Sequence, residues 1–473
     1  MPTELPSSTL ALSELETATN DSKRTEAVAK KALESTAIRA TIWTVADYGC
    51  SMALRVVNSL ILTRLLMPES FGLMTLVSTL VFGISLFADI GMGPNVIQSP
   101  RGDDPVFLNT VWTLEVFRGL GIFIVCLLLA WPISMIYHEP RLISLIPALA
   151  FSLVVNGLKS TNLLSMARHM GVRRVFVLDF STQIFGLLVT AGFALVYRSV
   201  WALVIGTILS GVYRLILSHS HLLIPGIRNS FCWDRESLQS LVHFGKWILL
   251  STAFSFFATQ ADRLILGKLI SFSLLGVYGI AYSVSDIPRA VISAFSYRVG
   301  FPFIAKRVHL PIAEFRRVFL HYRFRVLVAG AFLLCLMAYI GGFLVTKMYD
   351  SRYHAASWMV PVLALGLWHT LMYSTTLPAL LSLGKSSYQA TGNAAYFVAI
   401  VTAIPLGFYF FGMFGAVVAV AAGDLPMYFV MVRGASRESV STWRQDLQAT
   451  GIFLVLLGIG LGIRALFVHS SIF

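Results

Sequence analysis

The chain has 473 residues, of which 56% are hydrophobic and only 12% charged, and its mean hydropathy is +0.76. Soluble chains carry about 25% charged residues, so this composition excludes a soluble fold and indicates a membrane protein. The net charge is +13, but the basic residues stand in short connections between apolar segments rather than in a stripe interleaved with aromatic residues. Nucleic-acid binding is therefore not expected.

Residues 1–38 are polar and lack the apolar core of a signal peptide, so we expect an uncleaved tail. From residue 41 onward, twelve or thirteen apolar stretches follow, each long enough for a membrane crossing, which takes about 20 apolar residues. Their ranges are 41–65, 71–97, 107–137, 142–164, 174–197, 200–218, 243–267, 274–298, 324–348, 355–381, 392–411, 413–432 and 449–469. The pattern predicts an all-α polytopic membrane protein.

Basic residues predict the orientation of these segments. They crowd the connections before the first segment and after the fourth, sixth, eighth and twelfth, for example at Arg173, Arg228, Arg316 and Arg437. The alternate connections hold far fewer. Because cytoplasmic loops are enriched in Lys and Arg, the bias predicts a cytoplasmic N-terminus.

The chain resembles two copies of one unit. A shift of 204 positions pairs Trp43 with Trp247, Asn58 with Asp262, Arg64 with Lys268 and Gly72 with Gly276. Six crossings separate the copies, so both halves share one orientation and are related by an axis along the membrane normal. We expect a polar cytoplasmic tail (1–38), a first six-helix lobe (39–222), a cytoplasmic linker (223–242), a second six-helix lobe (243–433), and a cytoplasmic connection with one extra transmembrane helix (434–473). Such lobes can enclose a central cavity.

Ionisable residues at membrane depth cost about 2.5–3.5 kcal/mol each, so they mark pathways more often than chance. Arg55 lies near the middle of the first segment, too deep to reach the surface easily, and Asp47 lies about two turns below it. We expect both to face a watery cavity.

Two further ion pairs allow two readings. Glu115–Arg118 and Asp286–Arg289 are each three residues apart on one helix face. Each can neutralise itself as a structural pair, or it can face the cavity, and the sequence leaves both alternatives open.

The remaining deep polar residues are expected to have ordinary structural roles. Lys159 can extend its amine to the inner surface, and His369 is expected to be a hydrogen-bonded core residue rather than a proton carrier. Pro288 and Pro426 interrupt helices and can act as hinges, although proline is common in membrane helices. The four cysteines lack metal or redox spacing, and no P-loop or catalytic nucleophile is evident, so neither a metal, a cofactor nor an enzyme is expected.

Two pairs of stretches are similar to a known family. They are 62–73 (LTRLLMPESFGL) with 88–93 (ADIGMG), and 261–268 (ADRLILGK) with 275–282 (LGVYGIAY). These resemble the polysaccharide-transporter, or Wzx-type, oligosaccharide flippases of the multidrug, oligosaccharidyl-lipid and polysaccharide (MOP) exporter superfamily. The resemblance extends over nearly all of residues 40–432, and the segment at 449–469 lies outside it.

The resemblance implies two six-helix lobes in the bacterial inner membrane that move an oligosaccharide linked to undecaprenyl diphosphate to the outer leaflet. It implies basic cavity residues for the anionic head group, for which Arg55 is the first candidate and Arg118 and Arg289 are weaker ones. Asp47 and Asp286 are candidates for ion coupling. The implied partners are the lipid-linked substrate, membrane lipid, a polysaccharide polymerase, and the chain-length and export machinery.

Two other classes stay open from the sequence. The first is a proton- or sodium-coupled exporter of drugs or metabolites in the same superfamily. The second is a membrane enzyme such as a polymerase or glycosyltransferase, which usually needs a large outer loop. The longest breaks here, 219–240 and 299–323, both lie on the expected cytoplasmic side. We therefore favour the flippase.

Overall fold

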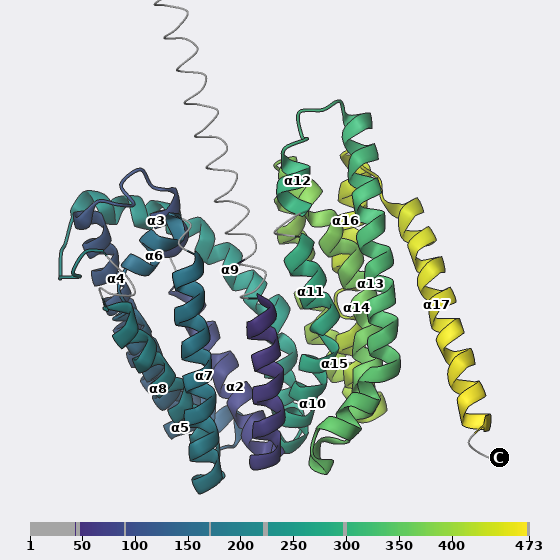
Figure 1. Ribbon diagram of the computed structural model, residues 1–473, viewed down its shortest axis with the longest axis horizontal. Coiled ribbons are helices and arrows are strands. Elements are labelled where there is room, and N and C mark those ends of the chain that lie inside the picture. The colour runs from purple at the N-terminus through teal and green to yellow at the C-terminus, as the bar shows by residue number, and fades with distance from the viewer. Residues whose placement is uncertain are drawn as a thin grey trace, which may run out of the picture.

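The computed structural model describes residues 43, 48–88, 91–169, 172–220, 226–296 and 300–470. Every extended element in this part of the chain is a helix (Figure 1). A first helix covers 48–65 and is followed by α2 (Pro68–Phe87), α3 (Met92–Gln98), α4 (Pro105–Tyr137), α5 (Leu142–Gly157), α6 (Asn162–Arg168), α7 (Val172–Tyr197), α8 (Val200–Ser218), α9 (Arg235–Leu269), α10 (Phe272–Ser285), α11 (Ile287–Phe295), α12 (Phe301–Ala305), α13 (Ile312–Met348), α14 (Ala356–Ser382), α15 (Ser387–Ala422), α16 (Leu425–Arg437) and α17 (Trp443–Ser470).

The predicted crossings coincide with these helices, which confirms the all-α polytopic fold. By length and composition alone, seven helical stretches of the described residues can cross a membrane, or eight if the bent pair α5–α6 is one crossing. The other expected segments are helical as well, including α9 and α14. Some predicted crossings are broken: the second divides at Gly91, which has a left-handed φ of 66°, and the eighth divides at Asp286, two residues before Pro288.

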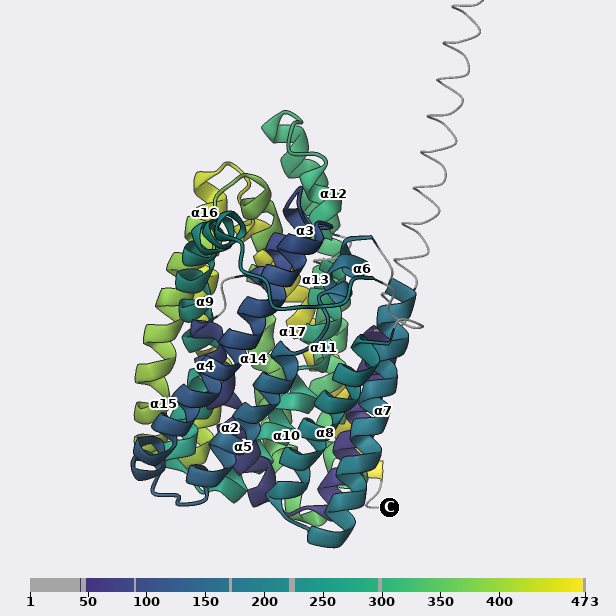
Figure 2. The same ribbon diagram turned by 90° about the vertical axis from the view of Figure 1, so that its left-hand side faces the viewer.

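The helices form two groups that lie side by side, with α2–α8 in one group and α10–α16 in the other (Figures 1 and 2). Within the groups, α4 packs on α5, α7 on α8, α13 on α14, and α15 on α16. Between them, α2 packs on both α9 and α10. This is the predicted architecture of two helical lobes, and the exact boundaries between the domains stay predictions.

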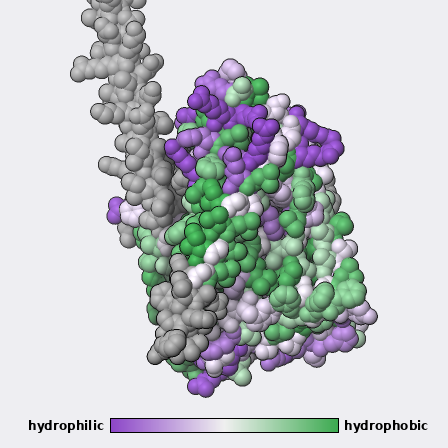
Figure 3. Space-filling view, turned by 90° about the vertical axis from the view of Figure 1, so that its right-hand side faces the viewer, coloured by the Kyte–Doolittle hydropathy of each residue, from purple (hydrophilic) through white to green (hydrophobic). Residues whose placement is uncertain are grey.

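The bundle has two distinct ends. The upper end in Figure 1 holds α3, α6, α12 and the start of α13, and the lower end holds the turns at 66–67, 138–141, 198–199, 270–271 and 349–355. Hydrophobic side chains dominate the middle of the face in Figure 3, and hydrophilic ones gather at the upper end and along the lower rim. That distribution matches a bilayer lying between the two ends.

Near the lower end the two lobes meet in a backbone contact between α2 and α10. A Cβ atom added to Gly72 would lie against the carbonyl oxygen of Phe272, and one added to Gly276 would lie against that of Pro68. Gly72 and Gly276 are the glycines that the 204-residue shift pairs. The internal duplication therefore brings equivalent small residues together at the lobe interface, where only glycine allows so close an approach.

Further contacts between the lobes support this closure. Arg352, in the turn after α13, donates to the carbonyl oxygens of Thr63 (3.3 Å) and Arg64 (3.1 Å) at the end of the first helix. The hydroxyl of Tyr353 donates to the carbonyl of Leu66 at 3.2 Å. A cation on carbonyls at a helix C-terminus is favourable because the helix dipole is negative there. The lower end is closed.

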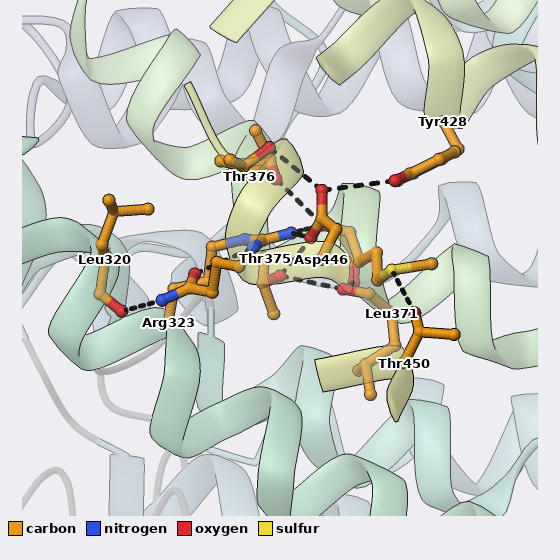
Figure 4. Close-up of polar contacts among 12 residues, drawn as sticks. Leu320, Arg323, Leu371, Thr375, Thr376, Tyr428, Asp446 and Thr450 are labelled. Carbon is orange, nitrogen blue, oxygen red and sulfur yellow. Dashed lines mark hydrogen bonds and ion pairs between the residues drawn. The ribbon is translucent and has the colours of Figure 1, made fainter. Parts of the chain in front are cut away.

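Helix α17, expected as an addition to the twelve-helix core, is held by a buried ion pair (Figure 4). The side chain of Arg323 on α13 is 0% exposed and contacts Asp446 on α17 (2.5 Å), the Met372 carbonyl (2.9 Å) and Gln445 (2.9 Å). Tyr428 on α16 also donates to Asp446, at 3.3 Å. The extra helix is thus joined to α13 and α16 of the second lobe.

Candidate functional site

A cavity of about 680 Å³ lies between the two lobes. Its walls come from the first helix and α2 on one side and from α9 and α10 on the other. Among the described residues that line it, Arg55 and Arg263 are the charged ones and none is acidic. The other polar lining residues are Asn58, Ser59, Thr75, Ser78, Thr79, Gln260 and Ser283. The wall of this cavity is therefore net positive.

Two smaller cavities adjoin the first and share Arg263 with it. One of about 230 Å³ lies in the second lobe and is lined by Asp286, Arg289 and Asp424 as well. The other, of about 420 Å³, lies between the first helix, α10, α11 and α13 and also contains Arg55. Arg263 thus stands where the three spaces meet.

Neighbours hold the guanidinium of Arg263 in place. It donates to the side-chain oxygen of Gln260 at 2.7 Å and lies over the ring of Tyr282, 5.2 Å from the centroid. Stacking and a neutral hydrogen bond fix its position without cancelling its charge. Within the described residues, Arg55 has neither an ion pair nor a hydrogen-bonded side-chain partner, and it is exposed to the cavity. Both cations remain available to an anion.

The two lobes supply these cations at different heights. The 204-residue shift pairs Arg263 with Ser59 and Arg55 with Thr259. The predicted repeat therefore offsets Arg263 from Arg55 by four residues along equivalent helices, which corresponds to about 6 Å at the helical rise of 1.5 Å per residue. An elongated anion can contact both.

The structure brings Asp286 and Arg289 together as a two-pronged ion pair. Arg289 donates to the two carboxylate oxygens of Asp286 at 2.5 and 2.9 Å, and both residues line the second cavity. Both alternatives that the sequence left open apply to this pair: its charges neutralise each other, and it also faces a cavity. Arg289 is for this reason a poorer anion ligand than Arg55.

The other predicted site residues fall elsewhere. Arg118 donates to Glu115 at 3.1 and 2.7 Å within α4 and is not among the residues that line the three cavities. Asp47 lies outside the described residues. The structure thus supports a cavity position for Arg55, Asp286 and Arg289, and assigns Arg118 to a pair within the first lobe.

Sequence reasoning missed two charged residues of the second lobe, Arg263 and Asp262, and noted a third, Asp424, only as a charge at membrane depth. Arg263 and Asp262 stand within one of the quoted family stretches and were not considered as membrane charges. Asp262 is buried and accepts a hydrogen bond from Tyr278 at 2.6 Å. Asp424 accepts from Thr370 at 2.5 Å and contacts the ring nitrogen Nε2 of His369. The same depth test that selected Arg55 would have found Arg263.

Comparisons with known proteins agree with this architecture. The inward closed form of the lipid II flippase MurJ superposes with a TM-score of 0.63 at 12% identity, covering 92% of this chain and 100% of MurJ. An inward-facing multidrug resistance MATE transporter of the MOP superfamily gives 0.63 at 14% identity, covering 82% and 94%. The fold is therefore that of the MOP superfamily transporters.

The family follows from the sequence itself. Residues 61–358 match the family described as polysaccharide biosynthesis protein, so the chain belongs to that family. It is 23% identical over 261 residues to the amylovoran biosynthesis protein AmsL of Erwinia amylovora (54% of this chain, 66% of AmsL). It is also 23% identical over 260 residues to the lipopolysaccharide biosynthesis protein WzxC of Escherichia coli strain K12 (54% and 51%). The matches span about half to two thirds of these relatives.

Proposed function

We propose that this protein is a flippase that moves an oligosaccharide linked to undecaprenyl diphosphate across the bacterial inner membrane. The observation that carries the proposal is the cavity between the lobes, whose described lining residues include Arg55 and Arg263 and no acidic side chain. The product would enter exopolysaccharide or lipopolysaccharide assembly, as the names of the relatives AmsL and WzxC suggest.

The two arginines suit a diphosphate head group. A guanidinium forms paired hydrogen bonds with phosphate oxygens and keeps its charge at every physiological pH. The stagger of Arg55 and Arg263 by about one helical turn matches a ligand that carries two phosphates in a row. The neutral polar residues around them, such as Asn58 and Gln260, can bind sugar hydroxyls.

The lipid tail needs an apolar space beside the charged cavity. The cavity of about 420 Å³ supplies one, because its walls include Met52, Val56, Leu60, Leu344 and Met348. Arg55, Arg263 and Asp286 also line this cavity, so a head group at Arg55 can lie beside its apolar wall. This separation of charge and chain is what a flippase requires.

The closed lower end gives the proposed direction. If the basic connections face the cytoplasm, the lower end faces outward and the lobes are closed on the outer side. The head group would then enter from the upper side and leave after the Gly72–Gly276 contact opens. Alternating access, the cytoplasmic N-terminus, and delivery to a polymerase and export machinery all belong to this proposal.

The test is the analysis of lipid-linked intermediates in a strain that lacks the gene. The strain should accumulate the lipid-linked repeat unit in the inner leaflet, and the wild-type gene should restore export. Arg55→Ala and Arg263→Ala should each fail to restore it, and Arg198→Ala, in an exposed lower turn, should succeed. Normal export with the double variant Arg55→Ala/Arg263→Ala would overturn the proposed site.

A cation-coupled exporter of drugs or metabolites is the second candidate. It is favoured by the buried acidic residues of the second lobe, Asp262 and Asp424, and by the contact of Asp424 with His369. Asp47 and Asp286 remain predictions for ion coupling, and transport by Asp47→Asn and Asp286→Asn at different ion gradients tests them. Drug accumulation in the deletion strain, with normal lipid intermediates, would favour this candidate over the flippase.

A further inference from the structure

One lower turn differs from all the other lower turns described above. It joins the two arms of α15 at Gly412, which is the non-helical residue of that element, with φ 58° and ψ −145°. The other five lower turns each carry charged residues, namely Arg64 and Glu69, Glu139 and Arg141, Arg198, Lys268, and Lys347 with Asp350 and Arg352. Residues 386–423, which include the Gly412 turn, carry no charged side chain.

Exposed aromatic side chains take the place of charges at this turn. Tyr409 is 81% exposed, Phe410 67%, Phe411 73% and Phe414 56%. Four large rings in contact with water around one turn would be unfavourable, since burial of each would gain free energy roughly in proportion to its apolar area. Tyr is typical of the boundary between head groups and acyl chains, which fits Tyr409, and the three Phe rings beside it add apolar surface.

The backbone of the turn is also adapted to a medium without water. A single residue breaks the helix, so few carbonyl and amide groups lose their helical partners. The arms then pack directly on each other: a Cβ atom on Gly407 would lie against the carbonyl oxygen of Gly415, and one on Gly415 against that of Gly407. In a bilayer, unpaired backbone groups are costly, so a turn placed there must be short and tightly packed.

The length of the first arm of α15, before Gly412, agrees with a turn placed in the bilayer. From Ala394, the first residue after the polar start of α15, to Phe411 the helix has a rise of about 27 Å at 1.5 Å per residue. The hydrocarbon core of a bilayer is about 30 Å thick, and tilting would shorten the reach further. The first arm is therefore nearly as long as the core is thick, so the tip can lie close to the far side of the core.

We propose that the turn at 409–414 is a lipid-binding tip, immersed at the boundary between head groups and acyl chains of the leaflet at the lower end. The charged side chains at the other five lower turns favour water instead. The second lobe is thereby anchored in that leaflet by one hairpin. The inference concerns the resting protein and is independent of the transported substrate, so it can fail without affecting the proposed function.

Spin labels on the purified full chain in phosphatidylethanolamine–phosphatidylglycerol vesicles test this. Phe411→Cys carries the label, Arg198→Cys is the matched control on another lower turn, and the exposed Cys50 and the half-buried Cys232 are replaced by serine. Both labelled positions are exposed in the structure, so neither substitution disturbs the core.

Collision rates with oxygen, which concentrates in lipid, and with a water-soluble nickel chelate give the answer. Position 411 should show a nickel collision rate several-fold lower than position 198, together with a high oxygen rate. A high nickel rate at 411 would mean that the tip lies in water and would overturn the proposal. Low rates for both reagents would mean that protein, such as a second copy of the chain, covers the tip, which also overturns it.

Discussion

Replacing Asp446 by alanine tests how α17, the helix outside the predicted twelve-helix core, is held against the second lobe. In the native protein Arg323 and Asp446 are 0% and 3% exposed, and their contact at 2.5 Å neutralises two charges in the core. Asp446→Ala leaves the Arg323 guanidinium buried with only the Met372 carbonyl and the Gln445 side chain as acceptors. Removal of one partner from a buried pair costs about 3–5 kcal/mol, so the free energy of unfolding should fall by that amount.

The assay is reversible unfolding of the purified protein in mixed detergent micelles. Arg323→Met/Asp446→Leu should regain most of the lost stability, because it removes both buried charges and fills the space with apolar atoms. Glu236→Ala is the control, since that carboxylate is 85% exposed where it meets Arg101, and its loss should be nearly neutral. The reasoning is refuted if Asp446→Ala costs less than about 1 kcal/mol, or if the double variant is no more stable than the single one.

Three further outcomes are expected. Gly72→Leu should force the lobes apart at the lower end. A cysteine that replaces Ser59 should then react several-fold faster with a charged thiol reagent added on that side. An unchanged reaction rate would contradict the closure of the lower end. The hydrogen bond from Arg352 holds the pKa of Asp350 below its usual value of about 3.9. The contribution of this ion pair to the closed lower end is therefore complete at neutral pH and is lost only as the pH falls through that lowered pKa. Thiol reactivity at position 59 that changes between pH 5 and 8 would argue against it. Arg118→Gln should reduce thermal stability yet retain transport, and loss of transport in a stable variant would return Arg118 to the site.

The fold was accessible from the sequence because it depends on local properties. The length of the apolar segments predicts the helices, and Gly412 marks the boundary between two of them. The internal repeat predicts that Gly72 and Gly276 are equivalent. That they touch required the structure, since the contact depends on how the two lobes are packed.

The site was accessible only in part. Arg55 could be selected because a deep cation without a nearby acid is unfavourable unless it meets a cavity. Arg263 shares that property, but its convergence with Arg55 joins helices about 200 positions apart in the sequence. The pairing of Arg323 with Asp446 depends on how α17 docks on α13, which no local pattern encodes. Arg118 illustrates the reverse case, because a deep arginine can be paired with an acid on its own helix.

The central claim is that Arg55 and Arg263 together carry a diphosphate head group between the leaflets. The direct measurement is transfer of a sugar-bearing undecaprenyl diphosphate in vesicles that contain the purified full chain, followed by accessibility of the sugar to an impermeant glycosidase. The account predicts that wild-type protein exposes the sugar of the inner leaflet, and that Arg55→Ala/Arg263→Ala leaves it protected as in empty vesicles. Equal exposure by the double variant and the wild type would contradict it.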